Sequence, residues 1–140
     1  MARKKRHWLW NILLTIAVIA CILAFIAHYK NWTRVKDGHI QILSGVYYKK
    51  LPLIDLDSVA MVDRIPQMQR INGFSAGMTE KGVFRDSIRN TKVYVYVDDL
   101  EQQKIRLVYQ DSMELFINYS DTTDTQQLYQ FFKTQIDSIQ

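Results

Sequence analysis

The sequence predicts an α+β protein in which an N-terminal transmembrane helix precedes a run of antiparallel strands that pack against one C-terminal helix. Three observations predict this arrangement. Residues 8–27 form an apolar run without charge, Gly or Pro, alternating apolar and polar residues follow it, and apolar residues at helical spacing end the chain. We therefore expect a basic cytoplasmic tail (1–7), a transmembrane helix (8–28), a juxtamembrane connector (29–38) and one domain (39–140).

The apolar run is long enough to cross a membrane. Its twenty residues span about 30 Å as an α-helix, which is the thickness of the hydrocarbon core. A cleaved signal sequence has a shorter apolar core, of about 7–15 residues, and an A-x-A site, whereas Ala24 and Ala27 are three positions apart. Residues 18–21 resemble a bacterial lipobox, at which cleavage leaves a lipidated Cys21, but the run continues to Ala27. We expect an uncleaved anchor, with a lipoprotein as the first alternative and an ordinary cleaved signal as the second.

Basic residues flank the run mainly on its N-terminal side. They are Arg3, Lys4, Lys5 and Arg6. Because Lys and Arg are retained in the cytoplasm, these topology determinants predict a cytoplasmic N-terminus at a bacterial cell (inner) membrane and a periplasmic or other extracytoplasmic domain. They also supply the whole net charge of +4, since residues 7–140 hold 14 basic and 14 acidic residues. A neutral domain lacks the basic surface that phosphate binding needs, so we expect no nucleic-acid partner.

The connector between the run and the domain is polar and aromatic. This composition suits the headgroup region, and we expect the helix to continue through the connector and to stop at Gly38. Alternation then begins with a strand at Ile40 and Ile42. Residues 45–48 either continue this strand or start the next one beyond a turn at Ser44-Gly45, and residues 49–52 interrupt the pattern.

The middle of the domain divides into a regular and an irregular part. Residues 57–63 predict a strand that ends before Pro66. Residues 67–90 contain three glycines, Gly73, Gly77 and Gly82, and predict a loop with short strands at most.

Three strands and a helix complete the prediction. Residues 91–97 alternate, with valines on one face and tyrosines on the other, and strands at 105–109 and 113–119 meet in a turn at 110–112. We expect these strands to form an antiparallel meander. The Asp/Thr-rich stretch 120–124 suits a helix N-terminus. The stripe at helical spacing that follows is Leu128, Phe131, Phe132, Gln135, Ile136 and Ile139.

Short motifs along residues 51–136 resemble those of the pleckstrin-homology (PH)-like domains that lie beside membrane segments in bacteria. The motifs are Leu51-Pro52-Leu53, Arg70-Ile71-Asn72-Gly73-Phe74, Gly82-Val83-Phe84-Arg85, the strand at 92–97, the hairpin through Asp111 and the helix start before Leu128. The resemblance implies an antiparallel β-sandwich or partly open barrel, made of a roughly orthogonal pair of sheets and capped by the one C-terminal helix, in a family of binding and assembly modules. It does not extend to phosphoinositide binding, because no Arg-x-Arg follows Lys49 and Lys50.

Residues suited to catalysis or metal binding are scarce. Cys21 is the sole cysteine and lies in the apolar run, and His39 is the only histidine near the domain. Asp98, Asp99 and Glu101 share one predicted turn without an EF-hand pattern, so we expect a solvated turn rather than a calcium site. We therefore predict no enzyme activity, no cofactor and no metal.

Basic residues interleaved with aromatic ones are the remaining candidates for function. We expect contact with a protein partner or with lipid at Lys49, Lys50, Arg70, Phe74, Arg85 and Arg89. The sequence thus predicts a single-pass, membrane-anchored, non-enzymatic module for protein interaction, assembly or self-association. Binding of a lipid headgroup or small ligand at the membrane surface is the alternative, and an enzyme of unrecognised type is the third.

Overall fold

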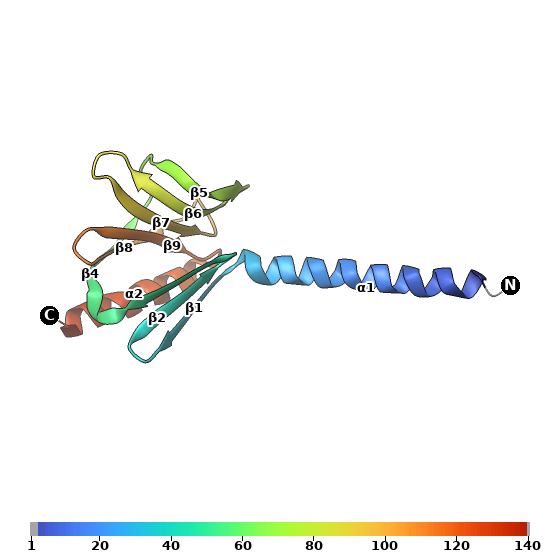
Figure 1. The fold of residues 1–140 in the computed structure, drawn as a ribbon. Helices are drawn as coiled ribbons and strands as arrows, with labels where there is room; N and C mark the ends of the chain where they lie inside the picture. Colours follow the sequence, from blue (N-terminus) through green and yellow to red (C-terminus); the bar gives the residue numbers. More distant parts are fainter. Residues whose placement is uncertain (1–2, 140) are drawn as a thin grey trace.

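The computed structural model describes residues 3–139, with side chains described for residues 7–26 and 30–139. A long helix leads into a domain of two sheets and a second helix (Figure 1). The elements are α1 (Arg3–Tyr29), β1 (Asn31–Lys36), β2 (His39–Ser44), β3 (Tyr47–Pro52), a 3-10 turn η1 (Leu53–Asp55), β4 (Leu56–Val62), β5 (Gln69–Ala76), β6 (Thr79–Asp86), β7 (Thr91–Val97), β8 (Lys104–Tyr109), β9 (Met113–Asn118) and α2 (Thr122–Ile139). The α+β class is confirmed.

Helix α1 projects away from the domain (Figure 1). Its segment His7–Ile26 is the one helix of the described chain that is long and apolar enough to cross a membrane, and none of that segment is buried. Length and composition make α1 compatible with a transmembrane or signal anchor. The side chains of Arg3, Lys4, Lys5 and Arg6 lie outside the described part, so the orientation of the chain in a membrane stays a prediction.

Strands β1, β2 and β3 form an antiparallel three-stranded sheet. Strand β1 occupies most of the predicted connector, so the expectation of a helix that continues to Gly38 is wrong. The stretch alternates polar and β-branched residues, with Thr33 and Val35 on one face, and this pattern favours a strand. Gly38 and Asp37 instead make the tight turn between β1 and β2, with positive φ angles of 73° and 53°, as a type I′ hairpin requires. Residues 49–52 belong to β3 and do not interrupt it.

The other strands form a six-stranded sheet in the order β4-β8-β9-β7-β6-β5. Strand β9 pairs antiparallel with β8 and parallel with β7, so the predicted meander is wrong at this point. Residues 98–103 carry the chain past the position that β9 later fills. The three strands themselves form where the alternation predicted them, but a local pattern does not specify which strands become neighbours.

Strands β5 and β6 replace the loop that we expected at residues 67–90, and each contains eight residues. Two of the glycines that suggested irregular structure face each other across these strands, Gly73 opposite Gly82. A Cβ atom at Gly82 would lie 2.2 Å from the carbonyl oxygen of Asn72. The glycines therefore allow a close approach of two long strands and do not end them.

The six-stranded sheet has a hydrophobic core on each face. The core on the first face consists of Phe84, Val93, Val95, Val97 and Phe116. The larger core lies between the second face, the three-stranded sheet and α2, and it includes Tyr96 and Leu107. The predicted division of β7 into a valine face and a tyrosine face is thus confirmed. Helix α2 packs along β4 with Leu128, Phe132 and Ile136 buried, which confirms most of its predicted stripe.

Candidate functional site

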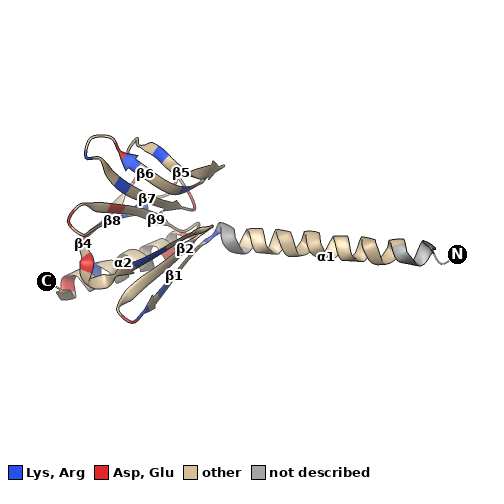
Figure 2. Ribbon diagram, viewed as in Figure 1, with Lys and Arg blue, Asp and Glu red and all other residues tan. Residues whose placement is uncertain are grey.

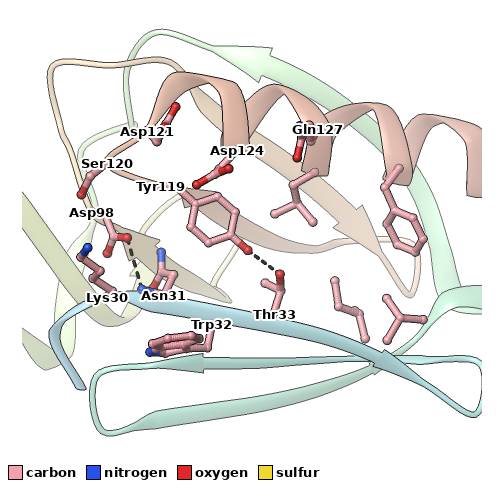
Figure 3. A pocket seen from close by; sticks show the side chains of 14 residues that line it. Lys30, Asn31, Trp32, Thr33, Asp98, Tyr119, Ser120, Asp121, Asp124 and Gln127 are labelled. Carbon is pink, nitrogen blue, oxygen red and sulfur yellow. Dashed lines mark hydrogen bonds between the residues drawn. The ribbon is translucent and has the colours of Figure 1, made fainter. Parts of the chain in front are cut away.

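A groove of about 680 Å³ opens between strand β1 and the N-terminal half of α2, close to the end of α1 (Figure 3). Its wall on the β1 side is made by Lys30, Trp32, Thr33 and Val35, its wall on the α2 side by Asp121, Asp124, Gln127 and Phe131, and its floor by Asn31, Ile40, Asp98, Tyr119, Ser120 and Leu128. The groove combines apolar side chains, at Val35, Ile40, Leu128 and Phe131, with several polar groups, which is the usual composition of a binding site.

Asn31 fixes the position of β1 at one end of the groove. This side chain is 5% exposed, and its amide nitrogen donates to the carbonyl oxygens of Tyr96 at 2.6 Å and Asn118 at 2.7 Å. Its amide oxygen accepts hydrogen bonds from the Lys81 ammonium at 3.0 Å and from the Ser44 hydroxyl. A single residue at the start of β1 therefore ties the three-stranded sheet, and with it the end of α1, to the six-stranded sheet.

A buried ion pair lies beside Asn31. The Lys81 ammonium is 2.9 Å from an Asp98 carboxylate oxygen, and the two side chains are 0% and 3% exposed. The other oxygen of Asp98 accepts from the Asn31 backbone N–H at 3.2 Å. Burial lowers the pKa of the Lys81 ammonium, although the hydrogen bond and the charge of Asp98 act in the opposite direction. Both charges are engaged inside the protein, so the pair orders the junction and is not arranged to act on a substrate.

Strand β1 is the edge strand of its sheet, and this edge faces the groove. The backbone N–H of Asn31 points to Asp98 and not to its cross-strand neighbour Ser44. In an antiparallel ladder every second residue points the same way, so the N–H and C=O groups of Thr33 and Val35 also point away from β2. The groove is therefore bordered by backbone groups that another strand can pair with.

Acidic side chains dominate the opposite wall. Asp121 caps α2, because its carboxylate accepts the backbone N–H of Thr123 at 2.8 Å, and Asp124 follows one turn later. Tyr119 lies between the walls, with its hydroxyl hydrogen-bonded to that of Thr33 (Figure 3). Burial raises the pKa of the Tyr119 phenol more than this hydrogen bond lowers it, so the phenol stays neutral. Among the described residues that line the groove, Lys30 is the one basic side chain and Asp121 and Asp124 are acidic, so the groove favours a positively charged ligand.

The predicted acidic turn does not form a metal site in the described residues. Asp98 is buried in the ion pair, while the Asp99 carboxylate accepts from the backbone N–H of Glu101 at 2.9 Å and from the Gln102 side chain at 3.0 Å. These are the hydrogen bonds of an ordered turn.

Two of the predicted contact residues lie on β3 and differ in direction. Lys49 points inward, with its ammonium 4.1 Å from the centroid of the Tyr94 ring and 5.6 Å from that of Tyr109. Such a cation–π arrangement holds the side chain within the domain. Lys50, the next residue, is exposed on the opposite face of the same strand.

The other predicted contact residues lie on β5, β6 and the turn after β6. Arg70 is 3.5 Å from a Glu80 carboxylate oxygen, and Arg89 binds the carboxylates of Asp86 and Glu114. Phe74 is half-buried on β5, and Arg85 is exposed on β6. The six candidates are thus spread over several elements, and the structure does not bring them into one site.

Sequence reasoning missed the residues that build the groove. Asn31 lay in the predicted connector, although the alternation around it is a strand signal. Asp121 and Asp124 were expected only as helix-capping residues, and their second role depends on the position of β1. No protein-family model, curated protein or solved structure matches the chain.

Proposed function

We propose that the chain is a single-pass membrane protein whose extracytoplasmic domain is a non-enzymatic interaction module, and that this module binds an extended segment of a partner protein in the groove between β1 and α2. The observation that carries the proposal is the edge of β1 along the groove. An extended peptide can add to such an edge as a further strand, because the backbone groups of Thr33 and Val35 point toward it.

The walls of the groove define the chemistry of the partner segment. Side chains of an added strand alternate in direction, so one set can contact the apolar side chains of Leu128 and Phe131 that line the groove. Basic residues in the segment are favoured by Asp121 and Asp124, which face the groove from α2. The groove lies beside the end of α1, which suits a segment that itself lies close to the membrane, such as the juxtamembrane part of another anchored protein.

Membrane anchoring through α1 is part of the proposal, with the N-terminus in the cytoplasm. Its support is the length of the apolar helix and the four basic residues before it. Protease added to intact cells from which the outer layers have been removed should digest the domain and spare the N-terminal tail. Digestion only after lysis would contradict this orientation. The mass of the mature chain separates an uncleaved anchor from a lipoprotein cut before Cys21.

A relationship to PH-like domains also belongs to the proposal. Two packed sheets with a C-terminal helix against them support it. The parallel pairing of β7 with β9 departs from a simple antiparallel meander and counts against the relationship.

Peptide display against the full chain in lipid nanodiscs tests the proposed binding. We expect selected peptides to combine residues of high β propensity with Lys or Arg. Val35→Pro removes an N–H from the edge without removing a bond to β2, and it should weaken binding by about tenfold. Val35→Thr keeps the N–H and serves as its control. Equal binding by the two variants would contradict strand addition.

Charge in the groove is tested separately. Asp124→Lys should weaken binding of the selected basic peptides by about tenfold, because it reverses a charge on the wall of the groove. Asp137→Lys makes the same change near the far end of α2, outside the groove lining, and should have little effect. The alternative function, binding of a small ligand, is favoured by the groove volume of about 680 Å³. In that case peptides are not enriched and Val35→Pro has no effect on ligand binding.

A further inference from the structure

The domain is neutral as a whole, but it consists of two parts with opposite net charge. Residues 30–52, which follow α1 and form the three-stranded sheet, contain five basic residues (Lys30, Arg34, Lys36, Lys49, Lys50) and one acidic residue (Asp37). Residues 53–140 contain nine basic and thirteen acidic residues. Among the charged residues of the strands that adjoin α1, basic ones therefore predominate, whereas the six-stranded sheet carries both signs (Figure 2).

Three of these basic residues, Arg34, Lys36 and Lys50, share one surface with exposed aromatic residues. The outer face of the three-stranded sheet, which points away from the larger core, consists of three cross-strand rows: Trp32, Leu43 and Tyr48; Arg34, Gln41 and Lys50; Lys36, His39 and Pro52. Trp32 is 57% and Tyr48 59% exposed. None of the nine residues is acidic, so the outer face is both amphipathic and positively charged.

The register places this face beside the end of α1. The hairpin between β2 and β3 turns at Gly45 and Val46, beyond the pair formed by Ser44 and Asn31, and therefore lies level with the last residues before β1. Gly45 has a φ of 61°, which suits the first position of a type II′ turn, and Val46 is 83% exposed at the tip. An apolar side chain thus projects at the membrane-proximal end of the domain.

The strands of this sheet run obliquely from the end of α1, with α2 and the six-stranded sheet on their other side (Figure 1). The outer face is consequently turned toward the side from which α1 enters. The aromatic row with Trp32 and Tyr48 is nearest to α1, and the row with Arg34 and Lys50 follows about 7 Å farther along the strands. This is the order of a membrane interface, in which aromatic rings lie at the headgroup level and basic residues face anionic phosphates.

We infer that the outer face of the three-stranded sheet is a second membrane contact: Val46, Trp32 and Tyr48 enter the headgroup layer of the bilayer that holds α1, and Arg34 and Lys50 bind anionic lipid headgroups. The inference rests on the proposed insertion of α1. A second copy of the chain is the less suitable occupant, because its acidic surface would match the basic rows but not the aromatic row beside α1. The contact holds the groove at a fixed height and direction above the membrane.

Fluorescence labelling of the full chain in lipid vesicles tests the inference. An environment-sensitive dye is placed on Val46→Cys in a Cys21→Ser background, in vesicles of zwitterionic lipid with and without anionic phosphatidylglycerol. Ile88→Cys, at a side chain that is 94% exposed in the turn after β6, is the matched control. We expect a nitroxide on the lipid headgroup to quench the dye at position 46 at least threefold more than the dye at position 88. Equal quenching at the two positions overturns the inference.

A third labelling site separates this outcome from a failure of the anchor. Cys21 of the unaltered chain lies within α1, so a dye on it should be quenched by a nitroxide near the bilayer centre. Quenching at Cys21 with equal quenching at positions 46 and 88 leaves the anchor in place and overturns only the second contact. Absence of quenching at Cys21 overturns the anchor, and the inference with it.

Charge reversal tests the basic rows. Arg34→Glu with Lys50→Glu should reduce quenching at position 46 at least twofold in anionic vesicles and much less in zwitterionic ones. Arg85→Glu with Lys92→Glu reverses an exposed cross-strand pair of the six-stranded sheet and should leave the quenching unchanged. If the two pairs have the same effect, the basic rows do not bind anionic lipid.

Discussion

The two sheets differ in how many of their faces are buried. The six-stranded sheet has a core on each side, so that along β7 both the valines and Tyr96 are interior residues. The three-stranded sheet buries one face, and its other face exposes Trp32, Arg34 and Lys50. Side chains that alternate between the two faces of a strand therefore belong to a fully buried strand in the six-stranded sheet and to a strand with one exposed, interacting face in the three-stranded sheet. The difference lies in the residue types at the alternate positions.

The largest loss of stability should come from a substitution in the buried ion pair of Lys81 and Asp98, at the junction between the two sheets. Asp98→Ala removes the partner of the buried Lys81 ammonium and leaves an uncompensated charge, so we expect a loss of about 3–5 kcal/mol in the free energy of unfolding. Urea denaturation of the full chain in micelles, followed by the near-ultraviolet circular dichroism of the tyrosines, measures it. Combining Asp98→Ala with Lys81→Met should recover much of the loss.

The control for Asp98→Ala is the ion pair between Glu80 and Arg70, which lies within the six-stranded sheet. Glu80→Ala removes the 3.5 Å contact with Arg70, whose side chain is 44% exposed, and should cost no more than about 1 kcal/mol. If Asp98→Ala costs as little as Glu80→Ala, the buried pair does not hold the sheets together.

Acid should weaken the six-stranded sheet through Glu114, a buried residue of β9. Burial alone raises the pKa of its carboxyl, but the guanidinium groups of Arg106, at 2.9 Å, and of Arg89 outweigh burial and lower the pKa below its usual 4.5. A group whose pKa is lowered by folding adds stability above the unfolded pKa and loses it as the pH falls through the folded one. Wild-type stability should therefore fall as the pH drops below about 4.5.

The variant Glu114→Gln isolates this contribution. We expect it to lower the free energy of unfolding by about 1.5–3 kcal/mol at neutral pH, because it removes charged hydrogen bonds, and to flatten the acid limb of the stability curve. Glu80, whose side chain is 23% exposed, provides the control, Glu80→Gln, which should leave the acid limb as in the wild type. An unchanged acid limb in Glu114→Gln would assign the acid sensitivity to other carboxylates.

The next largest loss of stability should come from the glycine pair of β5 and β6, Gly73 and Gly82. Gly82→Ala places a Cβ atom 2.2 Å from a backbone oxygen that cannot rotate away, so we expect a loss of about 1–3 kcal/mol. Gly77→Ala, in the turn between the same strands, meets nothing within 4 Å and carries only the cost of its positive φ of 59°, about 1 kcal/mol. Equal thermal stabilities of the two variants would show that β5 can move away from β6.

The sequence predicted well the elements whose pattern of apolar side chains depends on a uniformly apolar environment. The apolar run becomes α1, the valine–tyrosine alternation becomes β7, and the stripe through Leu128 and Phe132 becomes the buried side of α2. For β7 and α2, burial of apolar side chains decides the outcome, and periodicity reports burial directly. For α1, the continuous apolar run is itself the signal, since its side chains are not buried within the protein.

The elements that the sequence did not predict depend on contacts between distant segments. Strand β1 looked like a connector because Asn31 is polar, and this residue is buried only because Tyr96 and Asn118 accept its hydrogen bonds. Strands β5 and β6 looked like a loop because the need for glycine at position 82 comes from the opposite strand. The groove joins β1 to α2 across most of the chain, so no local pattern could reveal it.

The smallest loss of stability should come from substitutions on the outer face of the three-stranded sheet. The adjacent residues Tyr47 and Tyr48 of β3 allow a direct comparison, because their side chains lie on opposite faces of the strand. Tyr47 points inward, stacks on Tyr96 with ring centroids 6.3 Å apart and donates to Asn72 at 3.1 Å, so Tyr47→Ser should cost about 1–3 kcal/mol. Tyr48 points outward, and Tyr48→Ser should cost no more than about 0.5–1 kcal/mol, from its contact with Leu43. Denaturation of both variants in micelles measures the difference. A larger loss for Tyr48→Ser would show that this side chain stabilises the fold. A small loss leaves its exposed ring available to the membrane.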